Sequence, residues 1–305
     1  MFLYYHNIES CDQKVLPMIT RSTWLHLRFP FSFFLLPVFL FGLCVTPEIN
    51  GPAAISMGFI LHFLLYPASN GYNSYFDKDQ QSIGGLKHPP KVSRELYWIS
   101  LLLDLMAIVW GAFIHWKVAW MLLVYGLVSK AYSHPAIRLK KYPYLGWLIA
   151  GLFQGAFTLL MVVLAVNPEN QWDWHPKIWG AALLSTLLLW GSFPMTQVYQ
   201  HQEDGRRGDV TISRKLGIRG TFLFTMVVFL LANGGFVYFF FTFESHQLVG
   251  WFVLAMLPIM GYFLYWMFQV WKDPTKADFN RTMRLNFISS FCLNLFFGLW
   301  LFFSN

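Results

Sequence analysis

Long apolar runs recur along the chain, and the short segments between them contain nearly all of the charged side chains. A helix that crosses a lipid bilayer needs about 20 predominantly apolar residues. The pattern predicts nine such helices, over residues 29–47, 52–72, 96–114, 118–133, 144–166, 178–199, 220–243, 248–270 and 284–303. Trp172 and Trp179 lie at the ends of such runs, where residues of the membrane interface are found. The sequence therefore predicts an all-α membrane protein.

The composition agrees with this fold class. Apolar residues make up 56% of the 305 residues and charged residues only 12%, whereas soluble proteins contain about 25% charged residues. Cys11, Cys44 and Cys292 lie far apart, so they predict neither a zinc site nor a disulfide framework. The first apolar run begins near Phe29, too far along the chain and too long for a cleaved signal peptide.

The basic residues predict the side of the membrane on which each loop lies. With nine spans, 20 of the 22 lysines and arginines fall in the N-terminal segment and in four alternate loops, and only Lys117 and Lys177 fall on the other side. Loops rich in lysine and arginine stay in the cytoplasm. We therefore expect a cytoplasmic segment at 1–28 and a single transmembrane domain at 29–305 whose C-terminus lies outside. The net charge of +7 then reflects topology and contact with anionic lipids, not nucleic-acid binding.

Two polar clusters follow the second and sixth apolar runs, both on the predicted cytoplasmic side. The first contains Asn73, Asp77 and Asp79, and the second contains Gln200, Glu203 and Asp204. Asn73 and Asp77 are four residues apart, a spacing that places two side chains on one face of a helix. Gln200 and Asp204 have the same spacing. Such oxygen ligands suit Mg²⁺, which completes its shell with water and phosphate oxygens. Two facing clusters can thus hold magnesium against a diphosphate.

Basic side chains near the clusters are candidates for binding diphosphate oxygens. They are Lys87, Lys91 and Arg94 after the first cluster, Arg138 and Lys140 in the next cytoplasmic loop, and Arg207 beside Asp204. Arginine can bind phosphate oxygens through two parallel hydrogen bonds. The same residues also suit a role as topology determinants in contact with lipid, and a single acidic cluster is most often only solvated. Two clusters at equivalent helix ends favour the functional interpretation.

At these residues the chain resembles the UbiA-type family of intramembrane aromatic prenyltransferases, whose fold has nine transmembrane helices. The family carries the motif Asn-Asp-x-x-Asp-x-x-x-Asp after helix 2 and Asp-x-x-x-Asp after helix 6. The segments LRFPFSFFLLP, YSHPAIRLKKYPYLG and EDGRRGDVTISRKLG resemble further parts of the family. Asn73 and Asp77 match the first motif, and Asp204 matches the second. Ser74, Gln81 and Gln200 stand where the family has aspartates.

The resemblance implies transfer of a prenyl group from a polyprenyl diphosphate to an aromatic or other lipophilic acceptor at the cytoplasmic membrane face, with Mg²⁺ assisting the loss of diphosphate. It implies catalytic roles for Asn73, Asp77 and Asp204. Mg²⁺ would be held by Asn73, Asp77, Asp79, Gln200, Glu203 and Asp204. The lost aspartates also leave open a non-catalytic relative that binds an isoprenoid or scaffolds a membrane pathway. A transporter fits less well, because the clusters lie at the membrane surface and not at its midplane.

Overall fold

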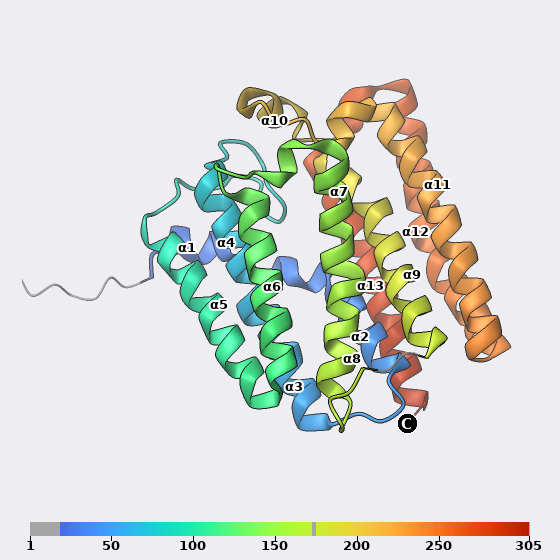
Figure 1. The fold of residues 1–305 in the computed structure, drawn as a ribbon. Helices are drawn as coiled ribbons and strands as arrows, with labels where there is room; N and C mark the ends of the chain where they lie inside the picture. The colour runs from blue at the N-terminus through green and yellow to red at the C-terminus, as the bar shows by residue number, and fades with distance from the viewer. Residues whose placement is uncertain (1–18, 173–174, 305) are drawn as a thin grey trace, which may run out of the picture.

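The computed structural model describes residues 19–172 and 175–304, which form a bundle of helices (Figure 1). The first half contains α1 (Arg21–Leu27), η1 (Phe29–Phe34), α2 (Leu36–Val45), α3 (Gly51–Phe59), η2 (Ile60–Leu65), α4 (Tyr66–Asp77), α5 (Glu95–Ile114) and α6 (Trp116–Ser133). The second half contains η3 (Leu139–Lys141), α7 (Pro143–Leu152), η4 (Phe153–Phe157), α8 (Thr158–Val166), α9 (Pro176–Ser192), η5 (Phe193–Gln197), α10 (His201–Arg207), α11 (Ile212–Phe243), α12 (His246–Lys272), η6 (Pro274–Lys276) and α13 (Phe279–Ser304). Helices thus occupy all the predicted apolar runs.

Seven helical stretches are long and apolar enough to cross a membrane. They are Gly51–Asp77, Glu95–Ile114, Pro143–Val166, Pro176–Gln197, Ile212–Phe243, His246–Lys272 and Phe279–Phe303. The pair Arg21–Phe34 and Leu36–Val45, bent by 43°, is an eighth if the two form one span. Within the described ranges, α6 is not among these stretches. The multi-helix membrane fold is confirmed, while nine spans and their orientation stay predictions.

The helices α2 and α8 lie at the centre of the bundle because each packs against two apolar cores. Val38 and Phe41 of α2 face the core that contains buried residues of α9, α11, α12 and α13. Phe39 and Leu43, on the other side of the same helix, face the core formed with η2, α5 and α6. A helix that is apolar all around is expected in this central position.

Gly155 allows the backbones of η4 and α9 to pack in close contact. A Cβ atom on Gly155 of η4 would lie only 2.6 Å from the Cα atom of Thr186 in α9. The hydroxyl of Thr186 accepts a hydrogen bond from the backbone N–H of Ala156 at 2.9 Å. Small residues allow this close approach in membrane proteins, where packing between helices is a main source of stability.

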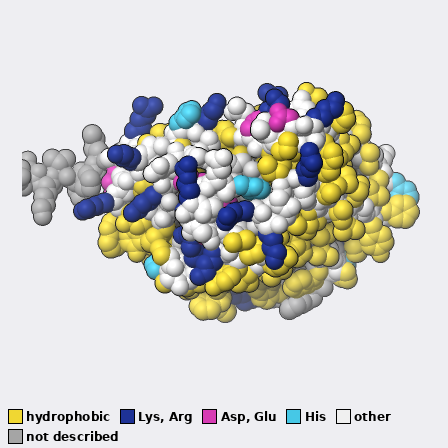
Figure 2. Space-filling view, turned by 90° about the horizontal axis from the view of Figure 1, so that it is seen from above, with side chains coloured by type: hydrophobic (Ala, Val, Ile, Leu, Met, Phe, Trp, Pro, Cys, Tyr) yellow, Lys and Arg dark blue, Asp and Glu magenta, His cyan; other side chains and the backbone are white. Residues whose placement is uncertain are grey.

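Charged side chains concentrate at one end of the bundle. Figure 2 looks onto this end, which carries α10, and shows the lysines and arginines gathered on it. Lys117 and Lys177 lie where α6 and α9 begin, at the opposite end in Figure 1. Between the ends, large apolar side chains such as Leu105 of α5 and Leu257 of α12 are exposed on the outer helices. This arrangement suits a protein surrounded by lipid.

A buried ion pair joins α5 to α6. The carboxylate of Asp104 contacts the ammonium group of Lys130, and the two side chains are only 11% and 15% exposed. The ammonium group also lies 5.0 Å from the centre of the Tyr72 ring. A charge inside an apolar bundle is costly unless it is paired, so each group depends on the other.

We predict that Lys130→Met lowers the stability of the bundle, because Asp104 then stays buried without a partner. The expected loss is about 3–5 kcal/mol, measured as a lower midpoint of unfolding in detergent. Adding Asp104→Leu to Lys130→Met should restore most of this loss, since both charges are then absent. Exposed Lys87→Met serves as the control. A single variant as stable as the wild type would contradict the role of the pair.

Candidate functional site

Residues of both polar clusters line one cavity of about 230 Å³ near the end of the bundle that carries α10. Asn73 and Asp77 reach the cavity from the last turns of α4, and Asp204 and Arg207 reach it from α10. Lys140 reaches it from η3. Segments that are far apart in the sequence thus place acids, an amide and basic groups around one space.

The end of α4 directs two acids into this cavity. The helix ends at Asp77 because Lys78 adopts a left-handed conformation with φ of 50°, and its N–H donates to the carbonyl of Ser74 at 3.0 Å. Asp77 and Asp79 on either side of this turn both line the cavity and are only 9% and 8% exposed. The ammonium group of Lys140 contacts Asp77 and donates to Oδ1 of Asn73 at 3.0 Å. One cation thus touches both residues of the i, i+4 pair.

The second cluster lies on the short helix α10. Gly208 ends this helix with φ of 75°, and the N–H of Asp209 donates to the carbonyl of Asp204 at 2.9 Å. Asp204 is 5% exposed. Burial raises the pKa of Asp204 to about 7, although the hydroxyl of Thr211, which donates to Oδ2 at 3.1 Å, acts in the opposite direction. Asp204 therefore holds its proton more readily than a solvated aspartate.

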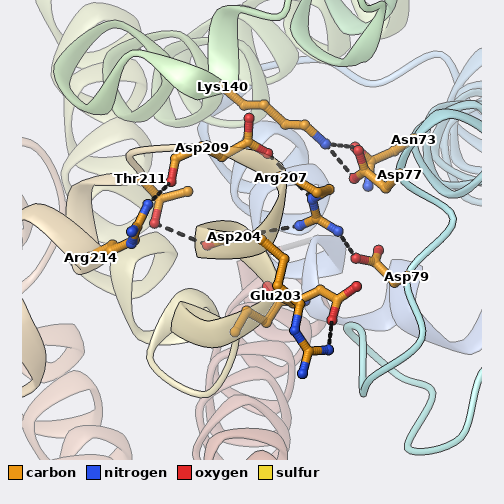
Figure 3. A network of polar contacts seen from close by, with 12 residues as sticks. Asn73, Asp77, Asp79, Lys140, Glu203, Asp204, Arg207, Asp209, Thr211 and Arg214 are labelled. Carbon is orange, nitrogen blue, oxygen red and sulfur yellow. Dashed lines mark hydrogen bonds and ion pairs between the residues drawn. The ribbon is translucent and has the colours of Figure 1, made fainter.

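Arg207 joins the two clusters, as Figure 3 shows. Its Nη1 contacts Asp79, and its Nη2 donates to Oδ1 of Asp204 at 2.8 Å. Its Nε donates to Oδ2 of Asp209 at 3.4 Å. Asp79 follows α4, whereas Asp204 belongs to α10 and Asp209 to the turn after it. A single positive group therefore lies between carboxylates of both clusters.

Arg138 and Asp209 form a second ion pair across the site. Arg138 donates through Nε to Oδ1 of Asp209 at 2.7 Å and through Nη2 to Oδ2 at 2.8 Å. Nη2 also lies 3.4 Å from Oδ1 of Asp77. Burial acts to raise the pKa of Asp209, but the hydrogen bonds from Arg138 and the charge of Lys140 outweigh it and lower the pKa. The sequence pattern alone predicted no role for Asp209, which ends the segment EDGRRGD.

Gln200 and Glu203 differ in their relation to the cavity. Gln200 lines it, and its Nε2 donates to the carbonyl of Ser82 at 3.3 Å. Glu203 lies outside the lining, and it accepts hydrogen bonds from the N–H of Gln80 at 3.4 Å and from Arg206 at 3.5 Å. Glu203 therefore ties α10 to the segment after α4.

The basic residues that follow the first cluster do not reach the cavity. Lys87, Lys91 and Arg94 are exposed, and none of them lines it. The loop turns back at Ile83 and places Ile83 and Gly84 in the lining. Spacing along the chain could not foresee this turn, because the turn depends on contacts with Phe31 and Arg28 from the first helices.

Two of the substituted family positions lie outside the cavity. Ser74 is 1% exposed and does not line the cavity, and within the described residues its hydroxyl has no hydrogen-bond partner. Gln81 is partly exposed and does not line it either. At these two positions, therefore, no side chain takes the place of a carboxylate at the cavity.

Arg28 is a site residue that sequence analysis treated only as a marker of topology. It lines the cavity, is 8% exposed, and donates to the carbonyls of Gly84 at 3.2 Å and Asn70 at 3.1 Å. Its guanidinium carbon lies 5.6 Å from the centre of the Phe31 ring. Among the described residues no carboxylate forms an ion pair with it. Its position at the start of the first apolar run was the available signal.

A second, mostly apolar cavity of about 200 Å³ adjoins the first. The two share the lining residues Phe31, Ser69, Asn70, Tyr125, Gln154, Phe193 and Thr196. Farther from the charged end, the lining comes from α2, α9, α11, α12 and α13, with Val38, Phe229 and Met256 among its residues. The charged cavity thus continues into an apolar chamber inside the bundle.

The donor set fits Mg²⁺, because carboxylate and amide oxygens are the ligands that this ion takes. The contacts of Arg207 also show that a cation can lie between Asp79 and Asp204. Within residues 19–172 and 175–304, however, no three His, Cys, Asp or Glu side chains are placed to share one metal ion. Lys140 and Arg207 contact the oxygens that would bind it. The metal assignment therefore stays a prediction.

Comparison with known proteins gives one family. The model of the UbiA prenyltransferase family matches residues 34–291. No curated protein sequence matches the chain. The apo structure of a UbiA homologue from Aeropyrum pernix K1 is similar, with a TM-score of 0.68, 14% identity, and coverage of 90% of this chain and 97% of that chain.

Two further structures are similar over most of their length. A UbiA homologue from Archaeoglobus fulgidus bound to GPP and Mg²⁺ has a TM-score of 0.64 and 17% identity, with coverage of 92% of this chain and 99% of that chain. A structure of digeranylgeranylglyceryl phosphate synthase has a TM-score of 0.57 and 17% identity, with coverage of 92% and 96%. At these identities the likeness shows the fold alone.

We predict that Arg138→Lys destabilises the site, because lysine keeps the charge but cannot form the paired hydrogen bonds to Asp209. The expected loss is about 1–3 kcal/mol, measured as a lower midpoint of thermal unfolding. Arg206→Lys is the matched control, since the Arg206 side chain is 62% exposed and should leave the midpoint unchanged. Equal midpoints for the two variants would contradict the role of Arg138.

Proposed function

Because the chain belongs to the UbiA prenyltransferase family, a family of transferases, we propose that it transfers a prenyl group from a polyprenyl diphosphate to an aromatic or other lipophilic acceptor. The observation that carries this proposal is the cavity where the acid clusters meet Lys140 and Arg207 and which continues into an apolar chamber. A charged head and an apolar tail need such a pair of spaces. The fold of homologues described as bound to GPP or DMAPP together with Mg²⁺ also supports it.

In this proposal the diphosphate binds at the charged cavity. Lys140, Arg207 and Arg28 line it, and Arg138 adjoins it through Asp77 and Asp209. Charge-assisted hydrogen bonds from such groups to phosphate oxygens are short and strong. Lys87, Lys91 and Arg94 stay predicted contacts, but their exposed positions outside the cavity give them no support.

The prenyl tail would occupy the apolar chamber. Burial of apolar surface contributes about 25 cal/mol for each Å² removed from water, so a long tail gains much of its affinity there. The residues shared by the two cavities, among them Phe31, Tyr125 and Phe193, would then surround the junction of head and tail. The reacting carbon lies at this junction in any prenyl diphosphate.

The reaction breaks the bond between the allylic carbon and the diphosphate oxygen, and the electron pair leaves with the diphosphate. The acceptor forms a bond to that carbon and gives up a proton. Lys140 and Arg207 would stabilise the negative charge that develops on the leaving group. The rings of Phe31, Tyr125 and Phe193 would stabilise the positive charge on the carbon.

Magnesium would act on the same leaving group. We propose that Asn73, Asp77 and Asp204, with catalytic roles, hold Mg²⁺ together with Asp79, Gln200 and Glu203. The bound ion supplies additional electrostatic stabilisation of the departing diphosphate.

We also propose the membrane orientation that the basic residues predict. The charged cavity would face the cytoplasm, because it lies at the end of the bundle on which Figure 2 shows lysines and arginines gathered. Nine spans, with α6 among them, would form one domain over 29–305. Residues 1–28 would form a cytoplasmic segment, of which 1–18 lie outside the described residues.

The function can be tested by comparing lipid extracts of cells with and without the chain by mass spectrometry. We predict that a prenylated compound disappears without the chain, returns with the wild type, and stays absent with Asp77→Asn or Asp204→Asn. Asp273→Asn is the matched control, because Asp273 caps η6 away from the cavity. Extracts that do not change on deletion would contradict catalysis and favour the non-catalytic interpretation. Full complementation by both site variants would contradict the roles assigned to Asp77 and Asp204 in holding the metal.

The apolar chamber yields a separate prediction. Ser289 of α13 lines the chamber, so Ser289→Phe should exclude long prenyl tails. Binding of geranylgeranyl diphosphate should weaken on the order of tenfold, as expected for an overpacking cost of about 1–3 kcal/mol, while binding of dimethylallyl diphosphate should not change. Leu299→Phe adds bulk to the exposed face of the same helix and serves as the control. An equal loss for both ligands, or none, would place the tail elsewhere.

A further inference from the structure

The acids that would bind a metal are already neutralised by basic side chains of the chain itself. Asp77, only 9% exposed, contacts the ammonium group of Lys140. Asn73 accepts from the same ammonium group at 3.0 Å. Lys140 is itself only 8% exposed, so this pair is shielded from solvent. A cation that binds at Asp77 must therefore displace Lys140.

Arg207 occupies predicted metal-binding oxygens between the two clusters, as Lys140 does at Asp77. It contacts Asp79 of the first cluster and Asp204 of the second, and its side chain is 17% exposed. A divalent ion that joins the clusters would need the oxygens that this guanidinium group uses. Lys140 and Arg207 thus contact the three carboxylates that both line the cavity and belong to the predicted metal set.

When Asp204 is ionised, the charges around the cavity are balanced without any ligand. The carboxylates are Asp77, Asp79, Asp204 and Asp209, and the cations are Arg28, Arg138, Lys140 and Arg207. A divalent ion alone would add positive charge without a counter-charge, and a diphosphate alone would add negative charge in the same way. Uncompensated charge is costly at buried positions. The two ligands together compensate each other.

We propose that Lys140 and Arg207 are internal counter-ions that make the divalent cation and the diphosphate bind cooperatively, each weakly alone and both tightly together. This inference rests on the proposed function. When a diphosphate binds, Lys140 and Arg207 exchange carboxylate oxygens for phosphate oxygens, and Asp77, Asp79 and Asp204 become free to bind the divalent cation. The coupling is reciprocal, since each ligand raises the affinity for the other by the same factor.

The proposal predicts effects of opposite sign on the two ligands. Lys140→Met and Arg207→Met remove a competitor of the metal and a partner of the diphosphate. The affinity for a divalent ion alone should rise, and the affinity for a diphosphate alone should fall. A residue that only clamped the diphosphate would not change the affinity for the metal alone. A residue that only held the fold together would not raise it.

The experiment measures Mn²⁺ binding to the full chain in detergent by electron paramagnetic resonance, without any diphosphate. Calorimetry with geranyl diphosphate in the presence of EDTA gives the other affinity. We expect weak binding of both ligands to the wild type. Each Met variant should bind Mn²⁺ roughly five- to 150-fold more tightly, a range that corresponds to typical coupling free energies between two sites. Each variant should bind geranyl diphosphate more weakly. Lys276→Met, which changes an exposed lysine of η6 outside the cavity, should change neither affinity.

Two additional measurements keep the test decisive if a Met variant unfolds. Arg207→Lys keeps one charge but cannot bridge three carboxylates, so its Mn²⁺ affinity should lie between those of the wild type and Arg207→Met. In the wild type, Mn²⁺ affinity should rise when a saturating amount of geranyl thiolodiphosphate is present, after correction for complexes in solution. The inference is overturned if Mn²⁺ binds the wild type equally tightly with and without this analogue, or if it binds the folded variants no more tightly than the wild type. Loss of the prenylated compound on deletion would then still support the proposed function, whereas absence of geranyl diphosphate binding even with saturating Mn²⁺ would contradict that function itself.

Discussion

The structure depends most on the requirement that charges placed at the end of an apolar bundle be paired. Arg207 meets this requirement for three carboxylates at once, Asp79, Asp204 and Asp209. These acids come from the segment after α4 and from α10 with the turn that follows it, so the same contacts fix the relative positions of both polar clusters. The short helix α10 has little apolar surface of its own, and buried ion pairs hold it over the cavity.

Much of the fold could be predicted because membrane helices are apolar over lengths set by the bilayer. The runs at 96–114 and 248–270 correspond closely to α5 and α12. The spacing of Asn73 and Asp77 was likewise informative, because both lie on one helix and contact Lys140. The run at 118–133 forms helix α6 as predicted, but this helix is not apolar enough to count as a membrane span by composition alone.

The remainder of the site depends on contacts that no local pattern encodes. Lys91 and Lys140 are both basic residues in predicted cytoplasmic loops, yet only Lys140 is buried beside Asp77. Arg28 looks like an ordinary residue at the start of a membrane helix, but it donates to the carbonyl of Gly84 and lines the cavity together with that loop. Only the structure shows where Ser74 and Gln81, at positions where the family has aspartates, lie relative to the cavity. Neither side chain lines the cavity, where Lys140 and Arg207 contact Asp77, Asp79 and Asp204.

The central claim is that this cavity binds a prenyl diphosphate and that Lys140 and Arg207 change partners when it does. An experimental structure with geranyl thiolodiphosphate and Mn²⁺, in which anomalous scattering locates the manganese, tests this most directly. The account predicts a diphosphate in contact with Lys140 and Arg207, manganese beside Asp77 and Asp204, and the prenyl chain directed toward Tyr125 and Phe193. A diphosphate bound elsewhere, or Arg207 still in contact with Asp79 and Asp204 in the occupied site, would contradict it.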